Sequence, residues 1–80
     1  MKIRHVDFYS GSKGNESPRK IYTASGTIIV DRIIETKLEE DFDSKNRTRI
    51  FIFQGKNNKF YQLKVKQDSY ELKQIEKKEE

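Results

Sequence analysis

The chain contains no cysteine and no tryptophan, and among its 80 residues it has one proline and one histidine. Without cysteine it can form neither a disulfide nor a thiolate metal site. With His5 as the only histidine, the chain has too few suitable residues for a zinc site or a nucleophilic triad. No apolar stretch approaches the roughly 18 residues of a membrane span, and residues 1–5 lack the apolar core of a signal peptide. We therefore expect a cytoplasmic protein with no metal, no cofactor and no membrane partner.

Two short segments resemble ligand-binding motifs but lack the residues that define them. Residues 11–14, Gly-Ser-Lys-Gly, fall short of a phosphate-binding loop, and no helix is predicted after them. Residues 39–43 are acidic but lack the glycine and the regular spacing of a calcium loop. We interpret the first as a flexible hairpin loop and the second as a solvated connection. A domain this small rarely builds the cleft that paired carboxylates need for acid–base catalysis, so we expect no enzyme.

Apolar residues are few, at 32% of the chain against 38% charged, but they gather in short β-branched and aromatic clusters. Such clusters favour strands over helices. The expected strands cover residues 2–9, 19–24, 27–38, 47–54, 59–66 and 69–75. The length allows a single domain, residues 1–75, followed by a flexible charged tail at residues 76–80. The predicted fold is all-β: a small antiparallel barrel or strongly bent sheet of five or six strands, with no substantial helix.

The strand expected at residues 27–38 is unusual because its apolar residues fall on both sides of the alternating pattern. A central strand covered on both faces has this pattern, and a strand interrupted by a bulge or bend has it too. We expect the covered central strand and keep the bulge as the alternative. Residues 25–26, Ser-Gly, predict a tight turn before it.

The last three strands can be paired through their turns. A two- or four-residue hairpin loop within residues 55–58 puts Phe53 opposite Phe60, and a two-residue turn at residues 67–68 puts Tyr70 opposite Val65. Because side chains alternate between faces, this register separates two sets. One face then carries Thr48, Ile50, Ile52, Tyr61, Leu63, Val65, Tyr70 and Leu72. The other face carries Arg47, Arg49, Phe51, Phe53, Phe60, Gln62, Lys64, Lys66, Glu71, Lys73 and Ile75.

The second face combines aromatic rings with a run of bases, since seven bases and no acid fall between Lys45 and Lys66. Exposed rings can stack on nucleobases while arginine and lysine hold phosphates. The face therefore predicts a non-catalytic platform for single-stranded nucleic acid. The candidate binding residues are Arg47, Arg49, Phe51, Phe53, Phe60, Lys64 and Lys66.

Two alternatives stay open for this face. In the first, its phenylalanines are core residues covered by the first half of the chain, and the bases form a solvated rim that the acidic residues 39–43 meet. In the second, an edge strand or the aromatic face binds another protein or a second copy of the chain. The exposure of the three phenylalanines in the folded protein decides between platform and core.

Loose motifs cover most of the chain: Val6, a strand with proline and tyrosine at residues 17–22, a glycine turn at 25–26, residues 30–34, and a closing hairpin with residues 60–65 and 70–72. This pattern resembles a small uncharacterised bacterial family of all-β domains. Family members tend to carry a tryptophan after the third strand, where this chain has Glu35, Thr36 and Lys37. The resemblance implies a β fold without an established activity. Because some members are associated with DNA-repair polymerases, it also implies a connection to nucleic-acid metabolism.

Overall fold

The computed structural model describes residues 2–10, 16–43, 46–67 and 69–76, and within them it contains six strands and no helix. The strands are β1 (Ile3–Ser10), β2 (Glu16–Thr23), β3 (Gly26–Asp41), β4 (Asn46–Gly55), β5 (Phe60–Val65) and β6 (Tyr70–Ile75). Each coincides with a strand expected from the sequence. The segment predicted as a flexible loop, residues 11–14, lies outside the described residues, as does most of the predicted tail, residues 77–80.

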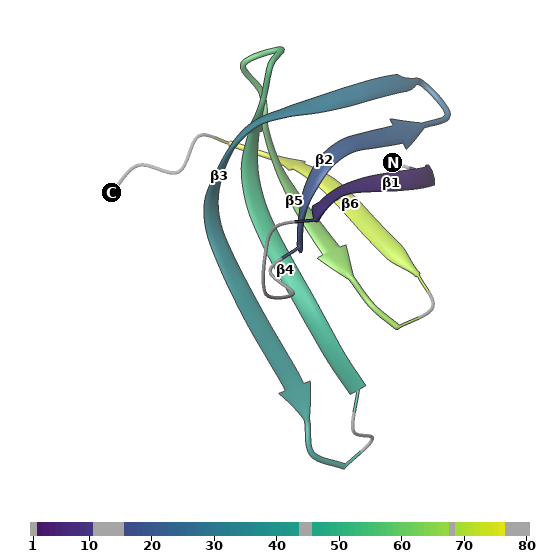
Figure 1. Ribbon diagram of the computed structural model, residues 1–80, viewed down its shortest axis with the longest axis vertical. Helices are drawn as coiled ribbons and strands as arrows, with labels where there is room; N and C mark the ends of the chain where they lie inside the picture. The colour runs from purple at the N-terminus through teal and green to yellow at the C-terminus, as the bar shows by residue number, and fades with distance from the viewer. Residues whose placement is uncertain (1, 11–15, 44–45, 68, 77–80) are drawn as a thin grey trace.

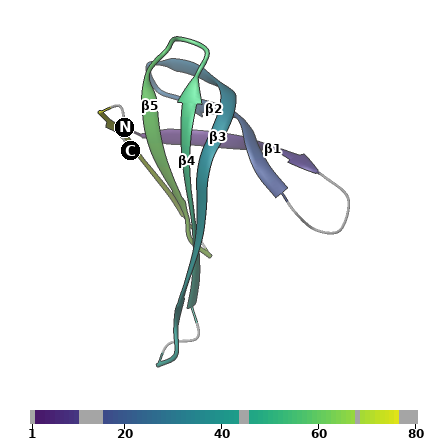
Figure 2. The same ribbon diagram turned by 90° about the vertical axis from the view of Figure 1, so that its left-hand side faces the viewer.

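The strands form one antiparallel meander in which every strand pairs with its neighbour in the sequence. The sheet curls strongly, so that β1 and β6 approach each other across the inside of a half-barrel (Figure 1, Figure 2). The ring centroids of Phe8 on β1 and Tyr70 on β6 lie 6.3 Å apart. Among the described strands no hydrogen-bonded pairing joins β1 to β6, so side chains alone close the curl. The predicted all-β fold, a small and strongly bent antiparallel sheet, is confirmed.

The core fills the inside of the curl. Its buried side chains come from every strand: Val6, Ile21, Ile28, Phe51, Phe53, Tyr61, Leu63 and Leu72. Phe53 and Tyr61 lie at its centre with stacked rings, 5.4 Å between centroids. Each fully buried side chain of this size contributes about 1.5–3 kcal/mol of hydrophobic stabilisation. Because β4 supplies both buried phenylalanines, it is the strand around which the others pack.

The predicted register between β4 and β5 is wrong by one residue. Phe53 faces Tyr61 rather than Phe60, and Phe51 faces Leu63. The cause is a three-residue loop, because Gly55 and Lys59 close the hairpin through the Gly55 N–H, which donates to the Lys59 carbonyl oxygen at 2.8 Å. Such a loop needs its last residue in the left-handed region, and Asn58 has a φ of 66°. A one-residue slip exchanges the two faces of a strand, so Phe51 and Phe53 turn into the core with Tyr61 and Leu63.

The predicted register between β5 and β6 is confirmed. Val65 faces Tyr70, Leu63 faces Leu72 and Phe60 faces Ile75. The register between β5 and β6 was thus predicted correctly, whereas the register across the asparagine-rich hairpin was not.

The expectation that the third strand is covered on both faces is wrong, and the bulge alternative is confirmed. β3 pairs with β2 only as far as Ile29 and pairs with β4 from Val30 onward. Its pairing with β4 shifts register twice, between Val30 and Arg32 and between Ile33 and Glu35. These shifts explain why apolar residues occupy both odd and even positions of the strand, although Ile29 and Ile34 are exposed.

β3 and β4 continue past the rest of the sheet as a two-stranded ribbon. The last pair between β4 and β5 is Arg49 with Val65, whereas β3 and β4 stay paired to Asp41 and Asn46. We call the projecting part, residues 38–43 and 46–48, the arm; it points away from β1 and β2 (Figure 1). The acidic residues expected in a connection therefore belong partly to a strand.

The hairpin after β4 gives a test of the register. Replacing Asn58 by Gly relieves the cost of a positive φ, so the free energy of unfolding should stay equal or rise by up to about 1 kcal/mol. Replacing Asn57 by Ala removes the amide that donates to the Tyr61 hydroxyl at 3.0 Å and the carbonyl that accepts from the Lys59 N–H at 3.0 Å. This change should lower the free energy of unfolding by about 1–2 kcal/mol. Urea unfolding of both variants measures the contrast; a loss of stability in Asn58→Gly would contradict the three-residue loop.

Candidate nucleic-acid interface

The seven residues expected to bind nucleic acid do not lie on one face. Phe51 and Phe53 are 2% and 0% exposed, inside the curl. Neither ring can stack on a nucleobase, because each is already covered by core side chains. The expected aromatic platform is therefore wrong for these two residues, and the core alternative is confirmed for them. The physical reason is the three-residue hairpin, which determines which side chains of β4 point into the core.

Arg49 lies on the same inner side as the two phenylalanines and is half-buried. Its guanidinium carbon, Cζ, lies 5.7 Å from the ring centroid of Phe8 and 5.9 Å from that of Phe51. A guanidinium between two rings is held by cation–π attraction. Because Phe8 belongs to β1 and Phe51 to β4, Arg49 connects the two sides of the curl, and we assign it a structural role.

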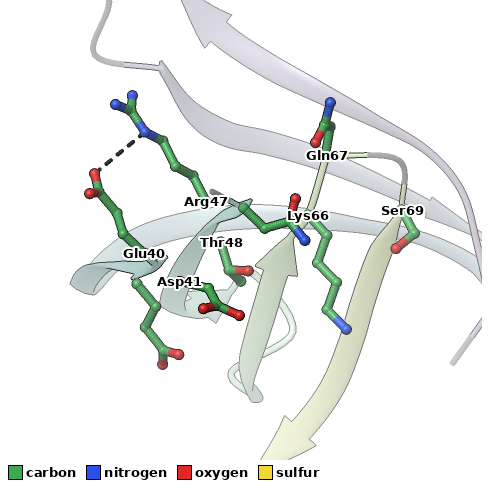
Figure 3. A pocket seen from close by; sticks show the side chains of 9 residues that line it. Glu40, Asp41, Arg47, Thr48, Lys66, Gln67 and Ser69 are labelled. Atoms are coloured by element: carbon green, nitrogen blue, oxygen red, sulfur yellow. Dashed lines mark ion pairs between the residues drawn. The ribbon is translucent and has the colours of Figure 1, made fainter. Parts of the chain in front are cut away.

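Arg47 and Lys66 border a groove of about 520 Å³ between the arm and the end of β5 (Figure 3). Each base has a carboxylate partner: Arg47 Nε lies 3.4 Å from Glu40 Oε1, and Lys66 Nζ lies 3.1 Å from Glu71 Oε1. The predicted contact between the acidic segment and the basic rim is thus present. Glu39 and Asp41 also line this groove. Three carboxylates from the arm outnumber the two bases, so the groove offers little attraction to a phosphate.

Phe60 and Lys64 lie on the outside of the sheet with a second, smaller apolar group. Ile50 and Ile52 on β4 are each 6% exposed there. Lys64 lies opposite Ile50 on the β5 side, and Phe60 is half-buried opposite Ile75. The hydrocarbon part of a lysine can cover an apolar neighbour while its charge stays in water. The seven candidates therefore occupy three separate places.

The structure brings rings and bases together on a different surface, which sequence reasoning missed. It is the outside of β1, β2 and the first part of β3, and we call it the N-terminal face. Its rings and bases are His5, Tyr9, Arg19, Lys20, Tyr22 and Arg32. His5 and Tyr22 are stacked at 5.7 Å between centroids, and Tyr9 is 62% exposed. No ion pair within 4.0 Å involves Arg19 or Arg32 in the part of the chain that the structure describes.

Tyr9, Arg19 and Arg32 line one groove of about 490 Å³. Two bulges build it. The β1–β2 register skips Arg19, and the β3–β4 register shifts between Val30 and Arg32. Bulges redirect side chains and increase the local twist, which is how both arginines come to border the same groove. Pro18, Val30 and Ile33 form its apolar wall, and Asp31 is its one acid.

The alternation of side chains on either side of Ile21 was a signal in the sequence from which this face could have been predicted. Ile21 is fully buried, so its neighbours Lys20 and Tyr22 must point outward. The bulge at Arg19 and the exposure of Tyr9 had no equivalent signal in the sequence.

Among the described side chains, no cluster of three or more histidine, aspartate or glutamate residues is placed to hold a metal ion. No helix long and apolar enough to cross a membrane occurs in the described ranges. In the comparisons with known proteins, no family model, no curated protein and no solved structure matches the chain.

The assignment of Arg49 to structure is testable. Arg49→Ala removes the guanidinium from between two rings and should lower the free energy of unfolding by about 1–2 kcal/mol. Arg47→Ala, which removes an exposed ion pair, should change it by less than about 1 kcal/mol. Urea denaturation of both variants provides the comparison. Equal stability of the two would show that Arg49 does not hold the curl together.

Proposed function

We propose that the protein is a non-catalytic module that binds single-stranded nucleic acid through the N-terminal face. The observation that carries this proposal is the groove in which the exposed ring of Tyr9 lies beside Arg19 and Arg32. Single-strand-binding surfaces combine these two features, a ring on which a base can stack and cations that follow the phosphates. Neither arginine is neutralised by an ion pair with the described residues.

The charge balance favours this face over the groove on the arm. The N-terminal groove has two arginines and one acid, whereas the groove beside the arm has two bases and three acids. Lys20, which lies opposite Asp7, and the His5–Tyr22 stack extend the N-terminal face along β1 and β2. The formal net charge of +4 adds a weak long-range attraction for polyanions.

A single strand fits the proposal better than a duplex. Stacking on Tyr9 requires an unstacked base, and only single strands, loops and ends present one at low cost. In the described part no helix is available to enter a major groove. The twisted outer surface of a small sheet is also the kind of surface on which OB-like domains hold single strands.

The arginines and the ring should affect binding differently. Removing both arginines, in Arg19→Ala/Arg32→Ala, should weaken binding to an oligonucleotide and reduce the slope of log affinity against log salt by about 1.4, or about 0.7 for each lost phosphate contact. Tyr9→Ala should cost about 1–3 kcal/mol of binding free energy and leave that slope unchanged. Fluorescence anisotropy with labelled single-stranded DNA and RNA across a salt series measures both quantities.

The matched control is Arg47→Ala/Lys66→Ala, which removes the same charge from the ion-paired bases of the other groove. It should weaken binding less than the double substitution on the N-terminal face. Equal losses would show that net charge, rather than this groove, governs the interaction. Absence of binding by the unaltered protein at low salt would remove the proposed function altogether.

A further inference from the structure

The outer edge of β3 is open over most of its length. β2 pairs with β3 only from Gly26 to Ile29, and beyond that point no other described strand lies on the side of β3 opposite β4. From Glu35 to Asp41 the pairing of β3 with β4 is regular, so the backbone there is extended and suited to a further strand. An open regular edge is a template for pairing with another chain.

The side chains along this edge are self-complementary about Thr36. One residue away on either side stand Glu35 and Lys37, which have opposite charges. Two residues away stand Ile34 and Leu38, which are 38% and 57% exposed and both apolar. If two copies pair antiparallel with Thr36 on the two-fold axis, Glu35 meets Lys37 of the second copy, and Ile34 meets its Leu38. The symmetry produces each of these contacts twice.

The faces of the strand agree with this pairing. Thr36 and Leu38 lie opposite Phe51 and Arg49, on the inner side of the sheet, whereas Ile34 is the extra residue of the bulge between Ile33 and Glu35. Glu35 and Lys37 lie opposite Ile52 and Ile50, on the outer side, where they already form an ion pair of 3.8 Å within the chain. The charged contacts would therefore form on the outer side, and Leu38 would make its contacts on the inner side.

We propose that the protein forms a two-fold symmetric dimer by antiparallel pairing of β3 with β3 of a second copy, centred on Thr36. Charges on an edge strand also serve to prevent aggregation, and charges of a single sign would do so. Here Glu35 and Lys37 carry opposite charges on either side of Thr36, so a two-fold axis through Thr36 places opposite charges next to each other. Cross-strand pairs of opposite charge and of apolar residues stabilise antiparallel pairing.

The arm extends the complementarity. The regular stretch ends at the bulge between Ile33 and Glu35, and beyond it the arm of one copy runs towards the segment of the second copy that β2 leaves free after Ile29. The arm is acidic and carries Phe42, which is 90% exposed at its end. The segment that it would meet borders the groove with two arginines and an apolar wall. A second copy of the chain thus supplies cations for the excess of acids on the arm and an apolar surface for its exposed phenylalanine.

Charge reversal at the centre tests the dimer. Sedimentation of the unaltered 9.5 kDa chain should show a mass that rises with concentration towards twice that value. Glu35→Lys and Lys37→Glu should each remain monomeric, because each places like charges opposite each other at both crossings. An equimolar mixture of the two variants should recover the dimer, because every crossing then joins opposite charges.

The mixture separates pairing between copies from effects within one chain. Each variant loses the ion pair between residues 35 and 37 of its own chain, and mixing cannot restore it. Leu38→Asp, at an exposed position, should also abolish the dimer without unfolding the protein, as circular dichroism would show. The proposal is overturned if the unaltered chain stays monomeric up to about 1 mM, equivalent to an association free energy weaker than about −4 kcal/mol. It is equally overturned if the single variants associate as the unaltered chain does, or if their mixture stays monomeric.

Discussion

The packing of Phe51 and Phe53 inside the curl is the constraint on which the rest of the structure depends. The chain has few large apolar residues, and a sheet that buried only one side of a flat layer would leave these rings in water. Curling brings β1 and β2 over β4, so that one small core serves all six strands. A domain of this size buries only about 60% of the surface that its unfolded chain exposes, which makes each such ring important for stability.

The facing of β4 also determines where charge can be used. Because Phe51 points inward, Arg49 must as well, and its guanidinium lies against two rings instead of in solvent. Arg47, two residues earlier, lies within the arm and pairs there with Glu40. The two arginines that precede the phenylalanines in the sequence are therefore occupied by contacts within the sheet. Arg19 on β2 and Arg32 at the bend of β3 have no such partner among the described residues, and they border the binding surface that we propose.

The sequence predicted the six strands well because each is a β-branched or aromatic cluster between polar turns. It could not predict the register at β4, because four consecutive residues, Ile50 to Phe53, are all apolar and buried. The alternation of side chains is then equally consistent with either alternate pair pointing into the core. Only the loop length decided, and it depended on Asn58 adopting a positive φ. The candidate site failed for the same reason, because exposure of Phe51 and Phe53 follows from that facing. The groove on the N-terminal face depends on two bulges, and a bulge is visible in sequence only as broken alternation, as in β3.

β3 links the two proposals, since it is the element whose length exceeds what the core needs. Its first part ends beside the arginine groove, and its last part forms the acidic arm. In the dimer, the arm of one copy would lie along the segment that borders this groove in the other. An acidic ribbon ending in an exposed phenylalanine offers the same chemistry as a single strand, negative charge together with an aromatic ring. A partner's arm and a nucleic acid would then compete for Arg32, and the competition would couple self-association to ligand binding through one strand, in the reciprocal manner that linkage requires.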